Sequence, residues 1–194
     1  MRKWIALLCL AALCLAAASA SAWGEPLVYT GMSGFTITLP ADWFAIIGGD
    51  DYDDEDDFDE YLEPGEIEAL FSSGDGMMSV TVLYAGGAPV HPHALEAVLG
   101  EAALVALVSQ VTGYQKQAYE FDEANRRAYL SYSLIDTEDN RPHTEFLVGF
   151  ITGSDIAQYV LIAVPADQLE AKFGLIGEIV NGIDIGGVRE GAEG

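Results

Sequence analysis

The feature that most constrains the fold is a series of four strand patterns in the second half of the chain, joined by short connections. Each pattern is a run of strand-forming residues bounded by turn residues, and the run from Arg127 to Ile135 alternates between apolar and polar positions. The four predicted strands are Gln115 to Phe121, Arg127 to Ile135, Thr144 to Thr152 and Ile156 to Val164. The connections are too short for the crossovers that parallel neighbours require. The sequence therefore predicts an antiparallel meander.

A further strand pattern organises the N-terminal part of the chain. Phe35, Ile37 and Leu39 alternate with threonines, and Pro40 ends the strand because it has no N–H to donate. Trp43 follows in a tight bend, from which it can fold back over the edge of the sheet. Short additional segments are expected at Leu27 to Tyr29, as a strand, and at Phe44 to Ile47, as a strand or an apolar turn.

A hairpin and two helices complete the predicted elements. Ile67 to Ser72 and Met77 to Tyr84 flank a glycine-containing turn, and a wide apolar stripe predicts a helix from Pro92 to Val111. A last helix is expected to begin near Pro165, with Gly186 and Gly187 after its end. Its apolar residues recur every three or four positions: Leu169, Phe173, Ile176, Val180 and Ile183. Together these elements predict an α+β fold with an antiparallel sheet packed between helices.

The order of these elements resembles the PsbP-like superfamily. A strand led by Gly34 ends in Leu39-Pro40-x-x-Trp43, and a hairpin, a helix, a four-stranded meander and a C-terminal helix follow. The resemblance covers about residues 30–185 and implies an α/β/α sandwich. Members of the superfamily include an extrinsic photosystem protein, Ran-binding relatives and many exported bacterial proteins. The resemblance implies a non-catalytic binding or accessory domain, and no functional residues are carried over from it.

The first 22 residues are typical of a secretory signal peptide. Arg2 and Lys3 precede an apolar run from Trp4 to Ala17, and small residues then lead to a predicted cleavage after Ala22. The alternatives are an uncleaved membrane anchor and lipoprotein processing. The sequence therefore predicts export, with no stable membrane insertion after cleavage.

Both cysteines, Cys9 and Cys14, lie in the predicted signal peptide. Lipoprotein processing at Cys14 is disfavoured because Leu13 stands where a small residue is required. The mature chain has no thiol for disulfides, catalysis or metal binding. We expect one domain at residues 23–185 and a flexible tail at residues 186–194.

The charge of the chain is strongly negative. It contains 31 acidic residues and 8 lysines and arginines, for a net charge of −23. Such a surface repels nucleic acids and anionic membranes and attracts cations and basic proteins. Solubility outside the cell is the simpler explanation of this charge. The expected partner is thus an unidentified protein or a cation, and not a nucleic acid.

The most acidic segment lies between Asp50 and Glu60, where nine of eleven residues are acidic. Dense carboxylates can bind Ca²⁺ weakly, although the spacing does not fit an EF-hand. The simpler interpretation is a solvated loop, and an interaction segment with Tyr52, Phe58 and Tyr61 as aromatic anchors is a third. The candidate metal ligands are Asp50, Asp51, Asp53, Asp54, Glu55, Asp56, Asp57, Asp59 and Glu60.

Other catalytic or metal-binding patterns are weak. His91, His93 and Glu96 have the composition of a zinc site, but the two rings flank Pro92 and only His143 occurs elsewhere. The chain has no Gly-x-Ser-x-Gly elbow and no phosphate-binding glycine loop. We expect an exported binding or accessory domain that is not an enzyme. The alternatives are a Ca²⁺-responsive protein and a hydrolase with an unrecognised carboxylate site.

Overall fold

The computed structural model describes residues 24–47, 65–137 and 140–186. The predicted signal peptide, the acidic segment 50–60 and residues 187–194 of the predicted tail lie outside these ranges. Within them, no helix is long and apolar enough to cross a bilayer.

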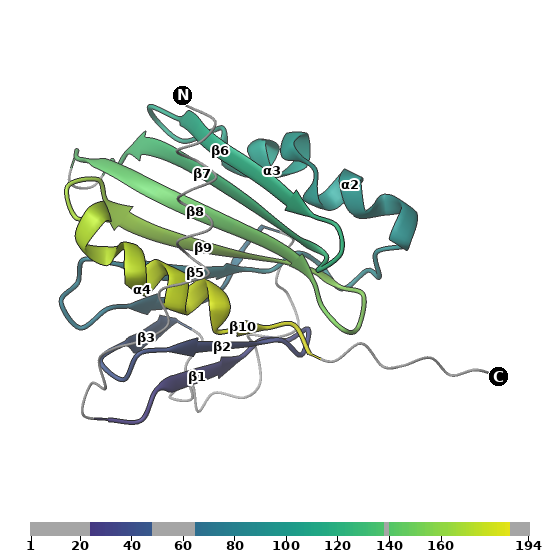
Figure 1. Cartoon of the computed structure of the whole chain (residues 1–194), viewed down its shortest axis with the longest axis horizontal. Coiled ribbons are helices and arrows are strands. Elements are labelled where there is room, and N and C mark those ends of the chain that lie inside the picture. Colours follow the sequence, from purple (N-terminus) through teal and green to yellow (C-terminus); the bar gives the residue numbers. More distant parts are fainter. Residues whose placement is uncertain (1–23, 48–64, 138–139, 187–194) are drawn as a thin grey trace.

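The described elements form three layers (Figure 1). The middle layer is a seven-stranded sheet. Helices α2 (Leu95–Leu99) and α3 (Glu101–Val108), which follow the short 3-10 helix η1 (Pro92–Ala94), cover one face. Helix α4 (Leu169–Asn181) and a small three-stranded sheet cover the other face. The predicted α+β class, with an antiparallel sheet between helices, is confirmed.

The seven-stranded sheet has the strand order β3-β4-β5-β9-β8-β7-β6, and every neighbouring pair is antiparallel. The predicted meander forms one half of it, and the β4–β5 hairpin adds to the meander through β9. The strands are β3 (Phe44–Ile47), β4 (Ile67–Ser72), β5 (Ser79–Leu83), β6 (Gln115–Asp122), β7 (Arg127–Ile135), β8 (Pro142–Ile151) and β9 (Ala157–Pro165).

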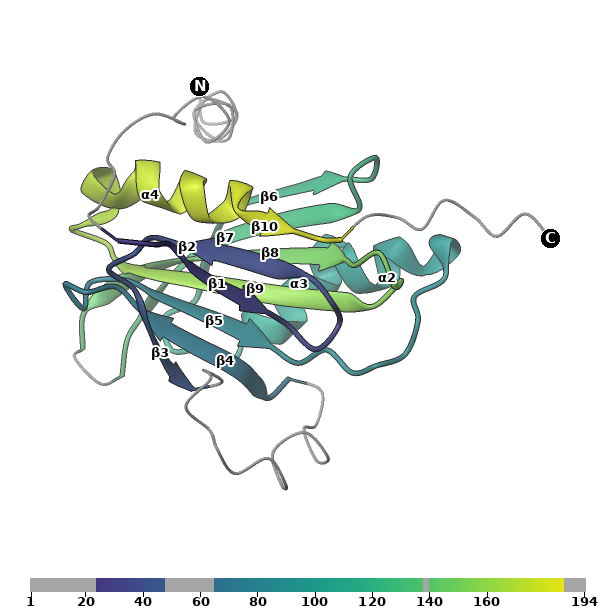
Figure 2. The same cartoon turned by 90° about the horizontal axis from the view of Figure 1, so that it is seen from below.

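The second sheet consists of β1 (Leu27–Thr30), β2 (Thr36–Leu39) and β10 (Ile183–Asp184), in the order β1-β2-β10 (Figure 2). The sequence predicted a helix through Ile183, and this was wrong. The chain leaves α4 at Gly182 and runs beside β2, where the Thr38 N–H donates to the Gly182 carbonyl. Ile183 remains buried, but it reaches the core from a strand.

Two further helix boundaries differ from the prediction. The helix predicted from Pro92 to Val111 is interrupted at Gly100, which is extended (φ −63°, ψ 156°) and caps both α2 and α3. A Cβ at Gly100 would lie 2.2 Å from the Glu96 carbonyl oxygen, so this sharp junction requires glycine. Pro165 is the last residue of β9 and does not begin α4, which starts at Leu169.

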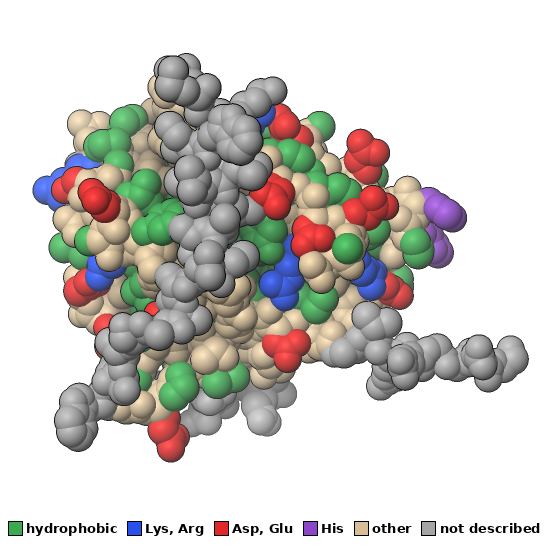
Figure 3. All heavy atoms as spheres, in the orientation of Figure 1, with side chains coloured by type: hydrophobic (Ala, Val, Ile, Leu, Met, Phe, Trp, Pro, Cys, Tyr) green, Lys and Arg blue, Asp and Glu red, His purple; other side chains and the backbone are tan. Residues whose placement is uncertain are grey.

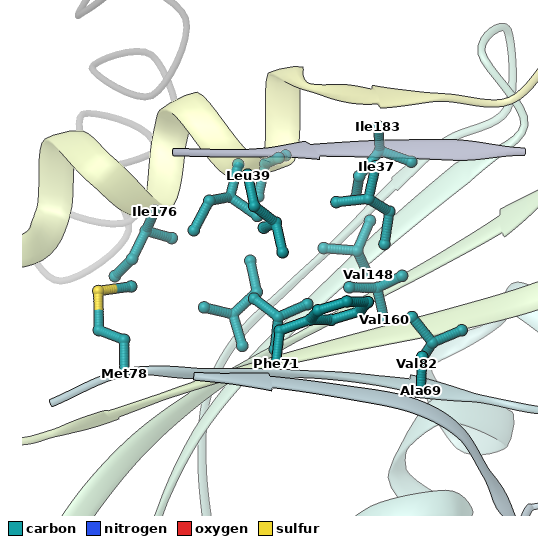
Figure 4. Packing of buried hydrophobic residues seen from close by; sticks show 14 of the residues in the cluster. Ile37, Leu39, Ala69, Phe71, Met78, Val82, Val148, Val160, Ile176 and Ile183 are labelled. Atoms are coloured by element: carbon teal, nitrogen blue, oxygen red, sulfur yellow. The ribbon is translucent and has the colours of Figure 1, made fainter. Parts of the chain in front are cut away.

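The inner core lies between the two sheets and α4. Figure 4 shows Ile37, Leu39 and Ile183 of the small sheet pointing toward Phe71, Val82 and other side chains of the large sheet. Trp43 is 5% exposed and belongs to this core, so the bend after Pro40 turns its ring inward. The alternating pattern of β2 is thus explained by burial of one face.

Candidate functional site

The predicted cation-binding acids, from Asp50 to Glu60, lie outside the described residues. The predicted histidine site falls within them. His91 and His93 are exposed on either side of Pro92. His143 lies on β8, with its Nδ1 3.9 Å from the Asp136 carboxylate. In the ranges that the structure describes, no three His, Cys, Asp or Glu side chains gather closely enough to hold a metal ion.

The first polar cluster surrounds Glu68, a buried carboxylate on β4. Glu68 is the extra residue of a β-bulge between Ile67 and Ala69. One carboxylate oxygen accepts hydrogen bonds from the Tyr29 hydroxyl and the Met32 N–H, each at 2.8 Å. The other accepts from the Gln158 amide, also at 2.8 Å.

These bonds join three parts of the molecule. Tyr29 and Met32 belong to the β1–β2 hairpin, Glu68 to β4 and Gln158 to β9. The Gln158 amide also donates to the Leu83 carbonyl at 3.0 Å. The Glu68 network therefore holds the small sheet against the large one. Its polar groups form hydrogen bonds with one another. No motif in the sequence signalled this role.

A second polar cluster lies on the α3 side of the sheet. Glu145 of β8 stands directly opposite Tyr132 of β7 and accepts a hydrogen bond from its hydroxyl. Burial raises the pKa of Glu145, the Tyr132 hydrogen bond and His143 offset part of that rise, and the Asp136 carboxylate adds to it. Burial also raises the pKa of Tyr132. Tyr114 packs against Tyr132 with ring centroids 5.3 Å apart. The Glu145 carboxylate is thus held by a tyrosine hydroxyl within the sheet.

A third feature is apolar and lies at the β3 end of the large sheet. We call it the β3–β4 patch, and it comprises Phe44, Ile46, Ile67, Leu70 and Leu83. Phe44 and Ile46 are each 51% exposed, and Ile67 is 40% exposed. Phe44 pairs with Ser72 on the outer face, whereas its neighbour Ala45 packs against the inner core. Ile46 is the extra residue of a second β-bulge.

Helices α2 and α3 leave the patch uncovered because they contact the opposite half of this face. Leu99 and Leu104 approach β8 at Gly149, where an added Cβ would lie 3.0 and 3.2 Å from their methyl carbons. The described apolar cluster beneath these helices includes residues of β6, β7, β8 and β9 but none of β3, β4 or β5. Among the residues that the structure describes, the outer face therefore has a covered half and an open half.

The charges are also unevenly placed along the chain. From residue 4 to residue 115 the sequence contains no lysine or arginine. The first basic residue after that gap, Lys116, is bonded to Glu101, and Arg126 to Asp155. Lys172 of α4 bonds Asp75 in the β4–β5 turn, which lowers the pKa of that acid to about 2. On the face in Figure 3, basic side chains are few and interspersed with acidic ones.

The sequence does contain a signal for the patch. Phe44-Ala45-Ile46-Ile47 is an apolar run without the alternation typical of a half-exposed strand. The sequence could not show which of these residues face inward, because the inner face is set by the small sheet. That sheet includes β10, which pairs with β2 across most of the length of the chain.

No family model matches the sequence, and no curated protein matches it significantly. Several solved structures do match. PsbP from the cyanobacterium Synechocystis has 12% identity and a TM-score of 0.49 over 87% of this chain and 97% of that one. The Saccharomyces cerevisiae Ran-binding protein Mog1p has 12% identity and a TM-score of 0.42 over 84% and 96%. LpqN of Mycobacterium tuberculosis, involved in cell envelope biogenesis, has 13% identity and a TM-score of 0.39 over 84% and 85%.

Proteins of the superfamily named from the sequence are thus among the matched structures. At these identities the likeness concerns the fold alone. We transfer no function, partner or site residue from it.

Proposed function

We propose that this chain is an exported, non-catalytic binding or accessory domain. Its domain spans residues 23–185 and follows a signal peptide at residues 1–22. It binds a partner protein through the β3–β4 patch. The observation that carries this proposal is the exposure of Phe44, Ile46 and Ile67 at one sheet edge.

Exposure of three large apolar side chains in one place is costly to a secreted protein. Fully burying one such side chain is worth about 1.5–3 kcal/mol, so three half-exposed ones leave several kcal/mol available for binding. An uncovered apolar strand at a sheet edge is also an aggregation hazard that proteins usually suppress. A partner that covers the patch explains why these side chains are present.

The polar clusters support a non-catalytic role. Glu68 accepts hydrogen bonds from three donors and is buried on the face of the sheet opposite the patch. Glu145 is engaged by Tyr132, and burial raises its pKa. Both clusters are better explained as polar connections within the fold.

The proposal can be tested by site-specific photo-crosslinking in the cells that produce the protein. A benzophenone amino acid is placed at Phe44 or at Ile46. Leu107 of α3 is the matched control, because it is also apolar and is 44% exposed. We expect the same discrete adduct from positions 44 and 46 and none from position 107. Equal adducts from all three positions, or no adduct from 44 and 46, would contradict the proposal.

A further inference from the structure

We infer that the partner of the β3–β4 patch presents apolar side chains flanked by lysine or arginine. This inference rests on the proposed function, because it assigns the chemistry of the partner to that same surface. It comes from the combination of two observations. One is the exposed apolar patch, and the other is the absence of lysine and arginine from residues 4–115.

The first step concerns the charge around the patch. Asp42 precedes β3 and Glu66 precedes β4, and both are exposed. The described segments between residues 24 and 115, which include β3, β4 and β5, contain no lysine or arginine. Lys172 reaches the β4–β5 turn from α4, which covers the inner face of the sheet, and it is bonded to Asp75. A partner at the patch therefore meets an excess of negative charge, which favours a cationic surface.

The second step excludes other occupants by the same charge. A second copy of this chain would be just as acidic, since the full sequence has a net charge of −23, so self-association through the patch is disfavoured. Anionic lipid surfaces and nucleic acids are disfavoured for the same reason. A basic protein segment gains from the charge and can also cover the apolar side chains.

The third step concerns how the segment binds. A β-bulge interrupts the pairing of β3 between Ala45 and Ile47, and bulges make a sheet edge a poor template for an added strand. The exposed side chains point away from the core instead. We therefore expect contact with the face of the sheet through side chains, rather than extension of the sheet by main-chain bonds.

The test uses three synthetic twelve-residue peptides as probes. One alternates leucine and lysine, one alternates serine and lysine, and one alternates leucine and glutamate. Each is titrated against the mature protein by fluorescence anisotropy at low and at moderate salt. The patch variant is F44T/I46T, in which threonine keeps the β-propensity, and the control variant is L107Q. Unchanged unfolding temperatures of both variants will show that they are folded.

We expect the leucine–lysine peptide to bind at least about tenfold more tightly than the other two, since tenfold corresponds to one well-buried apolar contact. That affinity should fall several-fold at moderate salt and about tenfold in F44T/I46T, and it should be unchanged in L107Q.

Three outcomes would overturn the inference. If the leucine–glutamate peptide binds equally well and also depends on Phe44 and Ile46, the surface binds apolar segments regardless of charge. The proposed function then stands, and only the chemistry of the partner is wrong. If the serine–lysine peptide binds equally well and F44T/I46T has no effect, the attraction is unspecific. If no peptide binding depends on the patch, the proposed function fails as well.

Discussion

The buried carboxylate of Glu68 gives the sharpest test of how the two sheets are joined. In the variant E68Q, one oxygen that accepts hydrogen bonds is replaced by an amide NH₂ of nearly the same size. The remaining oxygen can accept either from Tyr29 and Met32 or from Gln158, but not from both sides. One buried donor is therefore left facing another donor.

Two effects of this substitution oppose each other. Removing a buried charge is favourable, because a carboxylate is costly to take out of water. Losing a hydrogen bond to a charged group and leaving a buried donor unpaired costs about 1–3 kcal/mol. Since three donors already surround Glu68, we expect the loss to dominate, with a net destabilisation of about 2 kcal/mol. For a domain of this size, that lowers the unfolding temperature by roughly 4–8 °C.

The assay is urea unfolding of the mature protein, followed by tryptophan fluorescence. The control is E120Q, which removes the same charge from an exposed position on β6. We expect a lower midpoint for E68Q, an unchanged slope, and an unchanged midpoint for E120Q. If E68Q unfolds at the same or a higher urea concentration than the parent, the Glu68 network does not hold the sheets together as described.

Four further predictions follow from the structure and the sequence. The substitution G149A should destabilise the protein by about 1 kcal/mol, because Leu99 and Leu104 must move to make room for the methyl group. The substitution G174A, in open space on α4, should stabilise it by up to about 1 kcal/mol. Thermal unfolding compares the two variants with the parent. Because the pKa of Glu145 is raised in the folded state, the parent loses stability as the pH rises above the ordinary value of 4.5. Glutamine cannot ionise, so E145Q should be more stable than the parent above that pH. Urea titrations should show that this difference vanishes at lower pH. If the segment from Asp50 to Glu60 binds Ca²⁺, millimolar Ca²⁺ will raise the unfolding temperature by several degrees relative to EDTA, and neutralising those acids will abolish the shift. N-terminal sequencing of the exported protein should begin at Trp23, and a sequence beginning elsewhere would refute the predicted cleavage.

A strand could be predicted from the sequence where the strands beside it in the sheet also lie beside it in the sequence. The alternation from Arg127 to Ile135 was sufficient to predict β7, because β6 and β8 lie immediately before and after it. The same reasoning failed for Ile183. Its spacing from Val180 fits a helix, but its place is set by pairing with Ile37, far away in the sequence.

Two other features depended on backbone geometry that composition does not reveal. Gly100 interrupts a sequence whose apolar stripe continues through it, because the chain turns there to bring Leu99 and Leu104 onto β8. Glu68 appears in the sequence as an acid within a strand, and only the bulge in β4 places it among its donors. The exposure of Phe44 was hidden for a similar reason, since the small sheet determines which face of β3 is inside.

The central claim is that this protein binds through the β3–β4 patch, and amide chemical-shift mapping tests it most directly. The mature protein is labelled with ¹⁵N and titrated with the leucine–lysine peptide. We predict that the largest shifts will occur in β3, β4 and β5, and that they will be lost in F44T/I46T. Shifts centred on α4 or β6, or shifts that persist in the double variant, would contradict the claim.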